Sequence, residues 1–325
     1  MDYSSKERDL ISIVMPAMNE EKNLPLCHEK VSGVMAPLDC DYEVLVIDND
    51  STDQTRRVCE EICAGDPHWS YIKLSRNFTA EHSIAAGLRY ARGDAVIILL
   101  SDLQEPPELI PEFIARWREG YAIVYGIHTA RPGESLGRRL FASLYYRLIN
   151  LLSDIPLPEH VADFRLMDRK VVNAVNRLGE RNRYLRGLSQ WLGFNRCGVK
   201  YSRSARESGQ SKTSVIFLLA YALRAISIFS NKPLRFFLFG GFFIMSITVV
   251  LAAFYFFLYL FIGSRAPGIL TVVLLLLANL GLTALGIGVL GEYISNIYTE
   301  TKQRPLWIVE DTINRDIPEE HRYGD

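Results

Sequence analysis

The sequence predicts an α/β domain built on a parallel sheet, followed by a helical hairpin that crosses a membrane. In the first hundred residues, short apolar runs rich in β-branched residues alternate with helix-like segments. Such alternation is typical of a parallel sheet with helices on both faces. Charged residues then almost disappear, because the stretch from Phe236 to Gly291 contains a single formal charge, Arg265. A composition shift of this kind marks the boundary between a water-soluble part and a membrane part.

Four apolar runs have the length and composition of buried strands. The strands are expected at Leu10–Met15, Tyr42–Ile47, Ser70–Leu74 and Ala95–Leu100, and the helices near Lys22–Met35, Thr52–Ala64 and Ala80–Ala91. Ligands of a parallel sheet bind beyond the carboxyl ends of its strands. The first polar motifs of the chain follow these strand ends, so we expect one edge of the sheet to hold the functional site.

Two uncharged runs, 236–262 and 266–291, are each longer than the ~20 residues that cross a bilayer. Basic residues stand before the first run and after the second, whereas the short connection holds only Arg265. The flanking basic residues are Lys232, Arg235, Lys302 and Arg304. By the positive-inside rule, the N-terminal domain, the C-terminal tail and both termini lie in the cytoplasm. The protein is therefore expected to be a multi-pass protein of the inner or plasma membrane.

The segment before the hairpin is apolar on most sides but carries Arg224 at its centre. A central arginine is costly inside a bilayer, so we interpret 213–231 as amphipathic helices at the interface, with a third span as the alternative. The helix expected at 136–152 either touches the membrane surface or packs on the sheet. The predicted organisation is a domain at 1–212, interface helices at 213–231, a hairpin at 232–295 and a tail at 296–325.

Acids follow three of the expected strands. Asp48 and Asp102 stand directly after buried runs, where a carboxylate can accept hydrogen bonds from a ribose or hold a divalent cation. The alternative is that these polar residues only cap the next helix, Ser51 or Thr52 in the second motif and Asp102 in the fourth. The net charge of −1 predicts no nucleic-acid partner.

The motifs in their order resemble the inverting family-2 glycosyltransferases with the GT-A fold, and within them the polyprenyl-phosphate glycosyltransferases. The resemblance covers nearly the whole chain. It rests on V-M-P-A-M-N-E-E (14–21), V-I-D-N-D-S-T-D (46–53), S-R-N-F (75–78), S-D-L-Q-E-P-P-E (101–108), A-D-F-R-L-M-D-R (162–169), R-S-A-R-E-S-G-Q-S-K (203–212), G-V-L-G-E-Y-I-S-N-I-Y (288–298) and R-P (304–305). It implies a Rossmann-like nucleotide-sugar-binding domain.

The resemblance also implies roles for individual residues. Asp163 matches the acid proposed as the catalytic base, and Asp102 and Gln104 match the ligands of Mg²⁺ or Mn²⁺. The expected nucleotide-sugar contacts are Pro16, Asn19, Glu20, Asp48, Asp50, Arg76, Asn77 and Ser101. The expected contacts to the acceptor phosphate or the diphosphate are Arg165, Arg203, Arg206, Ser211 and Lys212.

Three residues depart from the family pattern. Leu100 replaces the first acid of D-x-D, Asn49 stands where a second Asp is common, and Thr79 replaces a frequent glycine. Leu100 weakens the expected metal site. A phosphate acceptor is already largely ionised at neutral pH, because its second pKa is near ~6. We therefore weigh a positioning role for Asp163 above proton abstraction.

The sequence thus predicts an enzyme that transfers a sugar, glucose by preference, from a nucleotide diphosphate to undecaprenyl or another polyprenyl phosphate, with inversion. A UDP-sugar is favoured over a GDP-sugar. The product would serve cell-envelope glycan modification. The alternatives are a catalytically weak homologue acting as a scaffold and a family-2 polysaccharide synthase. The resemblance further implies a homo-oligomer, with a tetramer as one option, to which the glycines of the second span are suited.

Overall fold

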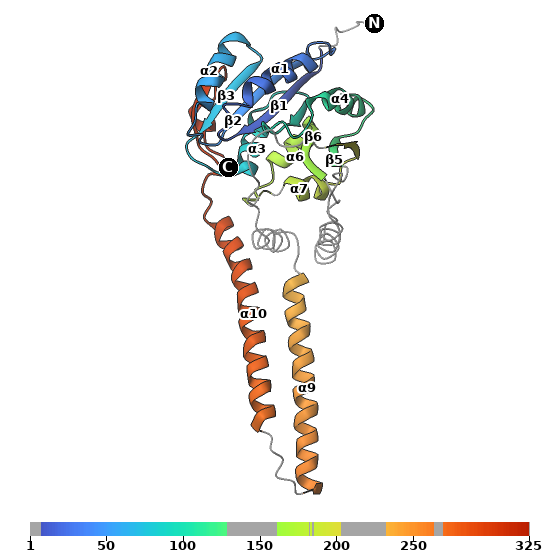
Figure 1. Ribbon diagram of the computed structural model, residues 1–325. Coiled ribbons are helices and arrows are strands. Elements are labelled where there is room, and N and C mark those ends of the chain that lie inside the picture. Colours follow the sequence, from blue (N-terminus) through green and yellow to red (C-terminus); the bar gives the residue numbers. More distant parts are fainter. Residues whose placement is uncertain are drawn as a thin grey trace. The chain divides into compact units, whose positions relative to one another are not determined.

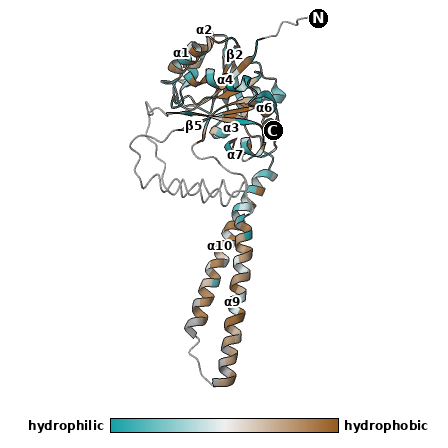
Figure 2. Ribbon diagram, turned by 90° about the vertical axis from the view of Figure 1, so that its right-hand side faces the viewer, coloured by the Kyte–Doolittle hydropathy of each residue, from teal (hydrophilic) through white to brown (hydrophobic). Residues whose placement is uncertain are grey.

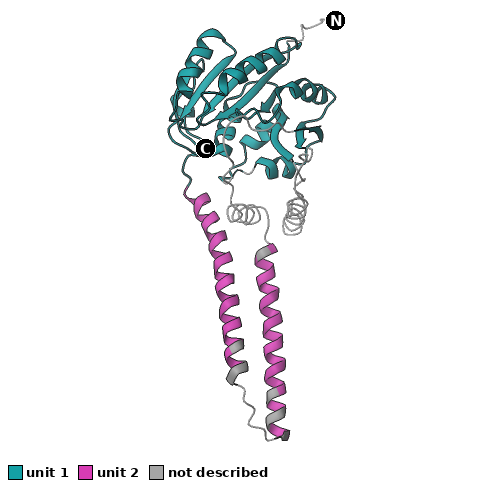
Figure 3. Ribbon diagram, viewed as in Figure 1, with its two compact units in different colours: residues 1–146, 155–212, 303–325 teal, residues 147–154, 213–302 magenta. Residues whose placement is uncertain are grey.

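The computed structural model describes residues 8–128, 161–181, 183, 185–202, 232–262 and 269–324. They divide into two compact units (Figure 3), of which the first holds residues 1–146, 155–212 and 303–325 and the second 147–154 and 213–302. The expected interface helices at 213–231 and the helix at 136–152 lie outside the described residues.

The first unit is an α/β domain around an eight-stranded sheet (Figure 1). Its strands run in the order β7-β5-β6-β4-β1-β2-β3-β8. The strands are β1 (Leu10–Ala17), β2 (Asp41–Asp48), β3 (Trp69–Leu74), β4 (Ala95–Ile98), β5 (Ile123–His128), β6 (Val161–Asp168), β7 (Arg196–Tyr201) and β8 (Val309–Ile313). The helices are α1 (Leu24–Met35), α2 (Thr55–Gly65), α3 (Ala80–Tyr90), α4 (Ile110–Arg118), α6 (Arg169–Asn176) and α7 (Leu185–Trp191), with short 3₁₀ turns η1 (Pro107–Leu109) and η2 (Glu319–His321).

All four predicted strands and all three predicted helices are confirmed, with ends that differ by a few residues. The four strands β4-β1-β2-β3 are mutually parallel, as expected. The whole sheet is mixed, however, because β6 runs antiparallel to β4 and β8 antiparallel to β3. Strands 5 to 8 come from parts of the chain for which the sequence analysis had predicted no strand.

Helices cover both faces of the sheet. Ile11, Ile13 and Met15 of β1 belong to the core shared with α1, α2 and α4, whereas Val14 belongs to the core shared with α3 and α6. This alternation follows the two-residue period of a strand. Because both faces are buried, the parallel strands read as continuous apolar runs, which is why the sequence identified them.

The segment expected as a separate C-terminal tail is part of the first unit. Residues 309–313 form β8, which pairs with β3 at the edge of the sheet. Trp307 is buried, and its indole Nε1 donates to the Tyr90 hydroxyl of α3 at 3.0 Å. The chain therefore returns to the first domain after the hairpin, a non-local pairing that no local pattern in 296–325 announces.

The second unit contains two long apolar helices, α9 (Lys232–Ile262) and α10 (Ile269–Thr301). Their windows Leu234–Phe254 and Leu275–Thr301 are long and apolar enough to cross a membrane, and none of either window is buried (Figure 2). Helix α10 continues ten residues past the predicted end at Gly291. It ends beside Gln303, whose φ of 47° is the left-handed conformation common after helix ends.

Candidate functional site at the carboxyl edge of the sheet

The carboxyl ends of the parallel strands bring the polar motifs to one edge of the sheet. Ala17 pairs with Asp48, so β1 and β2 end side by side. Ile98 at the end of β4 pairs with Arg165 of the antiparallel β6. The beginning of β6, which carries Asp163, therefore lies at the same edge as the Asp102 loop. Asp163 is 61 residues from Asp102 in the chain, and the antiparallel entry of β6 puts both at this edge.

The loops after β1 and β2 are joined by hydrogen bonds. The Asn19 backbone N–H donates to Ser51 Oγ at 2.9 Å, and the Thr52 N–H donates back to Asn19 Oδ1 at 2.8 Å. The Glu20 N–H donates to Thr55 Oγ1 at 2.9 Å. Asn19 and Asp50 both adopt left-handed φ values of 58° and 66°. Neither Ser51 nor Thr52 caps α2, so here the capping alternative is wrong.

Asp48 is buried, and both of its carboxylate oxygens accept hydrogen bonds from within the protein. Oδ2 accepts from the Tyr71 hydroxyl at 2.6 Å, and Oδ1 accepts from the Ser51 N–H at 2.9 Å and its hydroxyl at 2.5 Å. Burial raises the pKa of Tyr71, and the bond to Asp48 raises it further, so the phenol stays a donor. Asp48 thus organises the turn that follows β2, and its contact with a nucleoside remains a prediction.

Asn49 ties β2 to the loop that carries Arg76 and Asn77. Its Nδ2 donates to Asn77 Oδ1 at 2.9 Å, and its Oδ1 accepts from the Phe78 N–H at 2.8 Å. An amide suits this place because it offers a donor and an acceptor at once. The Arg76 guanidinium lies 4.0 Å from the centroid of the Phe78 ring. The departure from Asp at position 49 therefore has a structural role.

Thr79 takes the backbone conformation of the glycine that it replaces. Its φ is 86° and its ψ is 159°, a region that residues with a Cβ rarely enter. Its N–H donates to Asn77 Oδ1 at 3.0 Å, and its carbonyl accepts from Ser83 at the start of α3. The loop thus keeps its turn at the expense of backbone strain.

The loop after β4 holds the expected metal ligands. Ser101 is buried and its hydroxyl donates to the Pro16 carbonyl at 2.9 Å, which fastens this loop to β1. Asp102 is half-buried, and its Oδ1 accepts from the Gln104 N–H at 3.2 Å. The Gln104 side chain is buried. Within the described part of the chain, no three His, Cys, Asp or Glu side chains are grouped to hold a metal ion.

This donor set fits a divalent cation that takes most of its ligands from a diphosphate and water. Mg²⁺ is commonly bound by only one or two carboxylates together with substrate phosphates. Asp102 can supply such a carboxylate, and the half-buried Leu100 contributes no oxygen ligand where the family pattern has an acid. The structure therefore agrees with the expectation of a weak protein contribution.

Asp163 forms a bidentate ion pair with Arg186, a residue that the sequence analysis missed. Arg186 Nε lies 2.7 Å from Oδ1 and Nη2 lies 2.6 Å from Oδ2. Burial alone raises the pKa of Asp163, but the charge and hydrogen bonds of Arg186, with the charges of Arg165 and His128, hold it below its usual value. Arg186 is one of five arginines between Arg177 and Arg196, and no local signal distinguishes it from the others.

Arg165 is enclosed by protein acceptors. Its guanidinium donates to the Ala162 carbonyl at 2.8 Å, to Ser189 Oγ at 2.8 Å and to the Asp163 carbonyl at 3.2 Å. Its side chain is only 1% exposed. This placement suits a residue that links β6 to α7. The other expected phosphate contacts, Arg203, Arg206, Ser211 and Lys212, lie outside the described residues.

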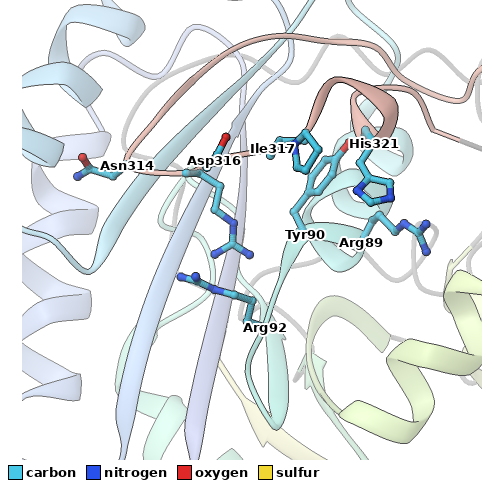
Figure 4. Close-up of a pocket in the computed structure, with 9 residues that line it drawn as sticks. Arg89, Tyr90, Arg92, Asn314, Asp316, Ile317 and His321 are labelled. Carbon is cyan, nitrogen blue, oxygen red and sulfur yellow. Dashed lines mark hydrogen bonds between the residues drawn. The ribbon is translucent and has the colours of Figure 1, made fainter.

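A hollow of about 400 Å³ lies between the end of α3 and the C-terminal segment, at the amino edge of the sheet (Figure 4). Its arginines do not converge, since Arg89 points away from Arg92. Arg92 and Arg315 instead share the buried Glu43, at 3.0 and 2.7 Å. Burial alone raises the pKa of Glu43, but hydrogen bonds from Arg92 and Ser12 and the charge of Arg315 lower it. This cluster anchors the C-terminal segment and is remote from the acids of the carboxyl edge.

A mixed sheet of this order, with acidic and amide side chains beyond the ends of its parallel strands, defines a GT-A-like transferase domain. The family model described as Glycosyl transferase family 2 matches residues 12–175, and the chain belongs to that family.

Similar proteins match over nearly the whole chain. A glycosyltransferase of Bacillus subtilis (strain 168), YkcC, is 39% identical over 92% of this chain and 93% of its own length. The bactoprenol glucosyl transferase of Shigella phage SfV is 36% identical over 92% of this chain and 97% of its own. Among solved structures, glucosyl-3-phosphoglycerate synthase from Mycobacterium tuberculosis, in complex with Mn²⁺ and UDP, has a TM-score of 0.46 at 20% identity, over 67% of this chain and 78% of that one.

Proposed function

We propose that the protein transfers a sugar from a nucleotide diphosphate to a polyprenyl phosphate, with UDP-glucose as the preferred donor and undecaprenyl phosphate as the preferred acceptor. The similarity to bactoprenol glucosyl transferase carries this proposal, because it extends over 92% of this chain and includes the apolar hairpin. A soluble transferase has no use for two helices whose apolar side chains are exposed along their length. A lipid-borne acceptor explains both features.

The chemistry of a phosphate acceptor fits the carboxyl edge. The attacking oxygen is already ionised at neutral pH, since the second pKa of a phosphomonoester is near ~6. The enzyme's main task is then to hold two anionic reactants in line, which supplies much of the acceleration. Attack opposite the departing nucleotide diphosphate inverts the anomeric carbon. Asp48 and the β1–β2 loops would hold the nucleoside, while Arg203, Arg206, Ser211 and Lys212 would hold phosphate.

A divalent cation, Mg²⁺ or Mn²⁺, is part of the proposal. Asp102 would hold it, with Gln104 as a second candidate, and its charge would offset the negative charge that builds on the leaving diphosphate. The Ser101–Pro16 bond keeps the Asp102 loop against the end of β1. The ion therefore adds to the arrangement of these loops and does not replace it.

The proposed location is the cytoplasmic side of the inner or plasma membrane. The basic residues Lys232, Arg235, Lys302 and Arg304 bracket the hairpin and support this topology. Assembly into a homo-oligomer, with a tetramer as one option, is part of the same proposal. Gly286 faces Phe237 of the neighbouring helix at 3.5 Å, so the glycines of α10 are already used for close packing within the hairpin.

A donor panel tests the function. Purified full-length protein in detergent is mixed with undecaprenyl phosphate and radiolabelled UDP-glucose, UDP-N-acetylglucosamine or GDP-mannose, with Mn²⁺ or with EDTA. We expect a labelled lipid with UDP-glucose, lost with EDTA and in Asp102→Asn. Absence of labelled lipid with every donor, from a protein that is folded and binds UDP, would favour the scaffold alternative.

A further inference from the structure

The acid at the start of β6 lies between two guanidinium groups. Arg186 forms the bidentate pair with Asp163, and Arg165 Nη2 lies 3.8 Å from Asp163 Oδ1 on the other side. One carboxylate thus faces two permanent cations, and the three side chains carry a net charge of +1. His128, at the end of β5, adds a further favourable charge when protonated. The cluster therefore has an excess of positive charge at the edge where anionic substrates would meet.

The two arginines differ in their access to solvent. Arg165 is 1% exposed, whereas Arg186 is 36% exposed and Asp163 is 27% exposed. The inner cation is sealed among backbone carbonyls and Ser189. The outer pair can be reached by a ligand. Arg186 is thus the group of this cluster that an incoming anion would contact.

The strand order separates this pair from the nucleoside end of the site. β6 lies on one side of β4, and β1 and β2 lie on the other. Asp48 and Asn19 are therefore on the far side of the Asp102 loop from Arg186. A donor spanning the β1–β2 loops and Asp102 leaves the β6 side for the acceptor.

We propose that Arg186 binds the phosphate of the acceptor and that Asp163 is its positioning residue, not a proton acceptor. This inference rests on the proposed function. Asp163 accepts two of the five N–H groups of the guanidinium and thereby fixes its plane. A planar donor fork that is already oriented loses less entropy when it binds an oxyanion.

Two physical arguments favour this assignment over a catalytic base. The pKa of Asp163 lies below its usual value, so this carboxylate has little tendency to take a proton. The acceptor phosphate needs no base at neutral pH. A purely structural pair is the other option. A partly exposed ion pair contributes only about 0–1 kcal/mol to stability, so its loss should barely change folding, and substrate binding separates the two.

The test uses full-length protein in detergent with Arg186→Met, Arg186→Lys, Asp163→Asn and the Arg186→Met/Asp163→Asn double variant. Arg57→Met is the matched control, because Arg57 pairs with Glu61 at 3.1 Å on the exposed face of α2. The KM values for undecaprenyl phosphate and for the sugar nucleotide are measured separately, together with kcat and Tm.

A charged hydrogen bond of about 1.5–3 kcal/mol corresponds to a loss of roughly tenfold or more in binding. We expect Arg186→Met to raise the KM for the lipid phosphate at least tenfold and that for the donor less than twofold, with Tm unchanged. Arg186→Lys should recover part of this loss. Asp163→Asn should raise the same KM, and the double variant should be no worse than Arg186→Met, because the acid acts through the arginine.

Equal KM values for Arg186→Met and the wild type, or a rise for the donor alone, would overturn the assignment. A loss of kcat alone in Asp163→Asn, additive with Arg186→Met, would restore the base. Should the wild type transfer no sugar at all, the proposed function fails by itself. Binding of farnesyl phosphate and of farnesol by the wild type and Arg186→Met then still tests Arg186: only the phosphate should bind more weakly to the variant.

Discussion

Thr79 offers a sharp test of backbone strain next to the nucleotide loops. Its φ of 86° and ψ of 159° lie where only glycine is at ease, and occupying that region costs a residue with a Cβ about 1–3 kcal/mol. Thr79→Gly removes the strain but adds flexibility to the unfolded chain, at about 0.4–1 kcal/mol. The matched variant is Thr79→Ala, which keeps the Cβ and the strain and loses only the hydroxyl near His82 Nδ1, at 3.0 Å.

Glycine at position 79 should therefore be more stable than alanine by roughly 1–2 kcal/mol, the part of the strain that the entropy does not offset. For a domain of this size, 1 kcal/mol shifts Tm by about 2–4 °C. Melting of the detergent-purified full-length variants, followed by intrinsic fluorescence at one scan rate, should place the glycine variant about 2–8 °C above the alanine variant. An alanine variant that melts at or above the glycine variant would refute the strain argument.

Three further perturbations probe the packing and charges of the first unit. Gly93→Ala should lower stability by about 1–3 kcal/mol, because a Cβ there would lie 2.6 Å from the Leu10 carbonyl, whereas Gly65→Ala, which meets nothing within 4 Å, should be neutral or stabilising in the same melt. Arg165→Met should cost roughly 3–5 kcal/mol, since it leaves buried acceptors unpaired; a melt within 2 °C of the wild type would contradict the burial argument. Glu43 has a lowered pKa, so its contribution to stability is present above its unfolded pKa of about 4.3 and is lost as the pH falls through the folded pKa. A Glu43→Gln variant should accordingly lose less stability on acidification than the wild type, and parallel losses in pH-dependent melts would argue against this linkage.

The parallel strands and the apolar hairpin were predictable from local patterns. β1, β2, β3 and β4 are buried on both faces and therefore appear as unbroken apolar runs. The hairpin needs only length and the absence of charge. The strand-end acids could be identified as candidates for the same reason, because a parallel sheet brings the carboxyl ends of its strands to one edge.

The remaining parts of the site depend on contacts between distant segments. β6 enters antiparallel beside β4, which brings Asp163 to the edge that holds Asp102. Arg186 comes from a third segment and is one of many arginines with similar neighbours in sequence. β8 joins the sheet from beyond the hairpin, more than 230 residues after its partner β3. None of these pairings has a local signature.

Local sequence pattern was thus enough to define an α/β domain, its acidic strand ends and a membrane hairpin, because burial period and segment length act on neighbouring residues. Only the tertiary structure decided which charges meet. It paired Asp163 with Arg186, enclosed Arg165 and strained Thr79, since these outcomes depend on how strands far apart in the chain are ordered and directed within one sheet.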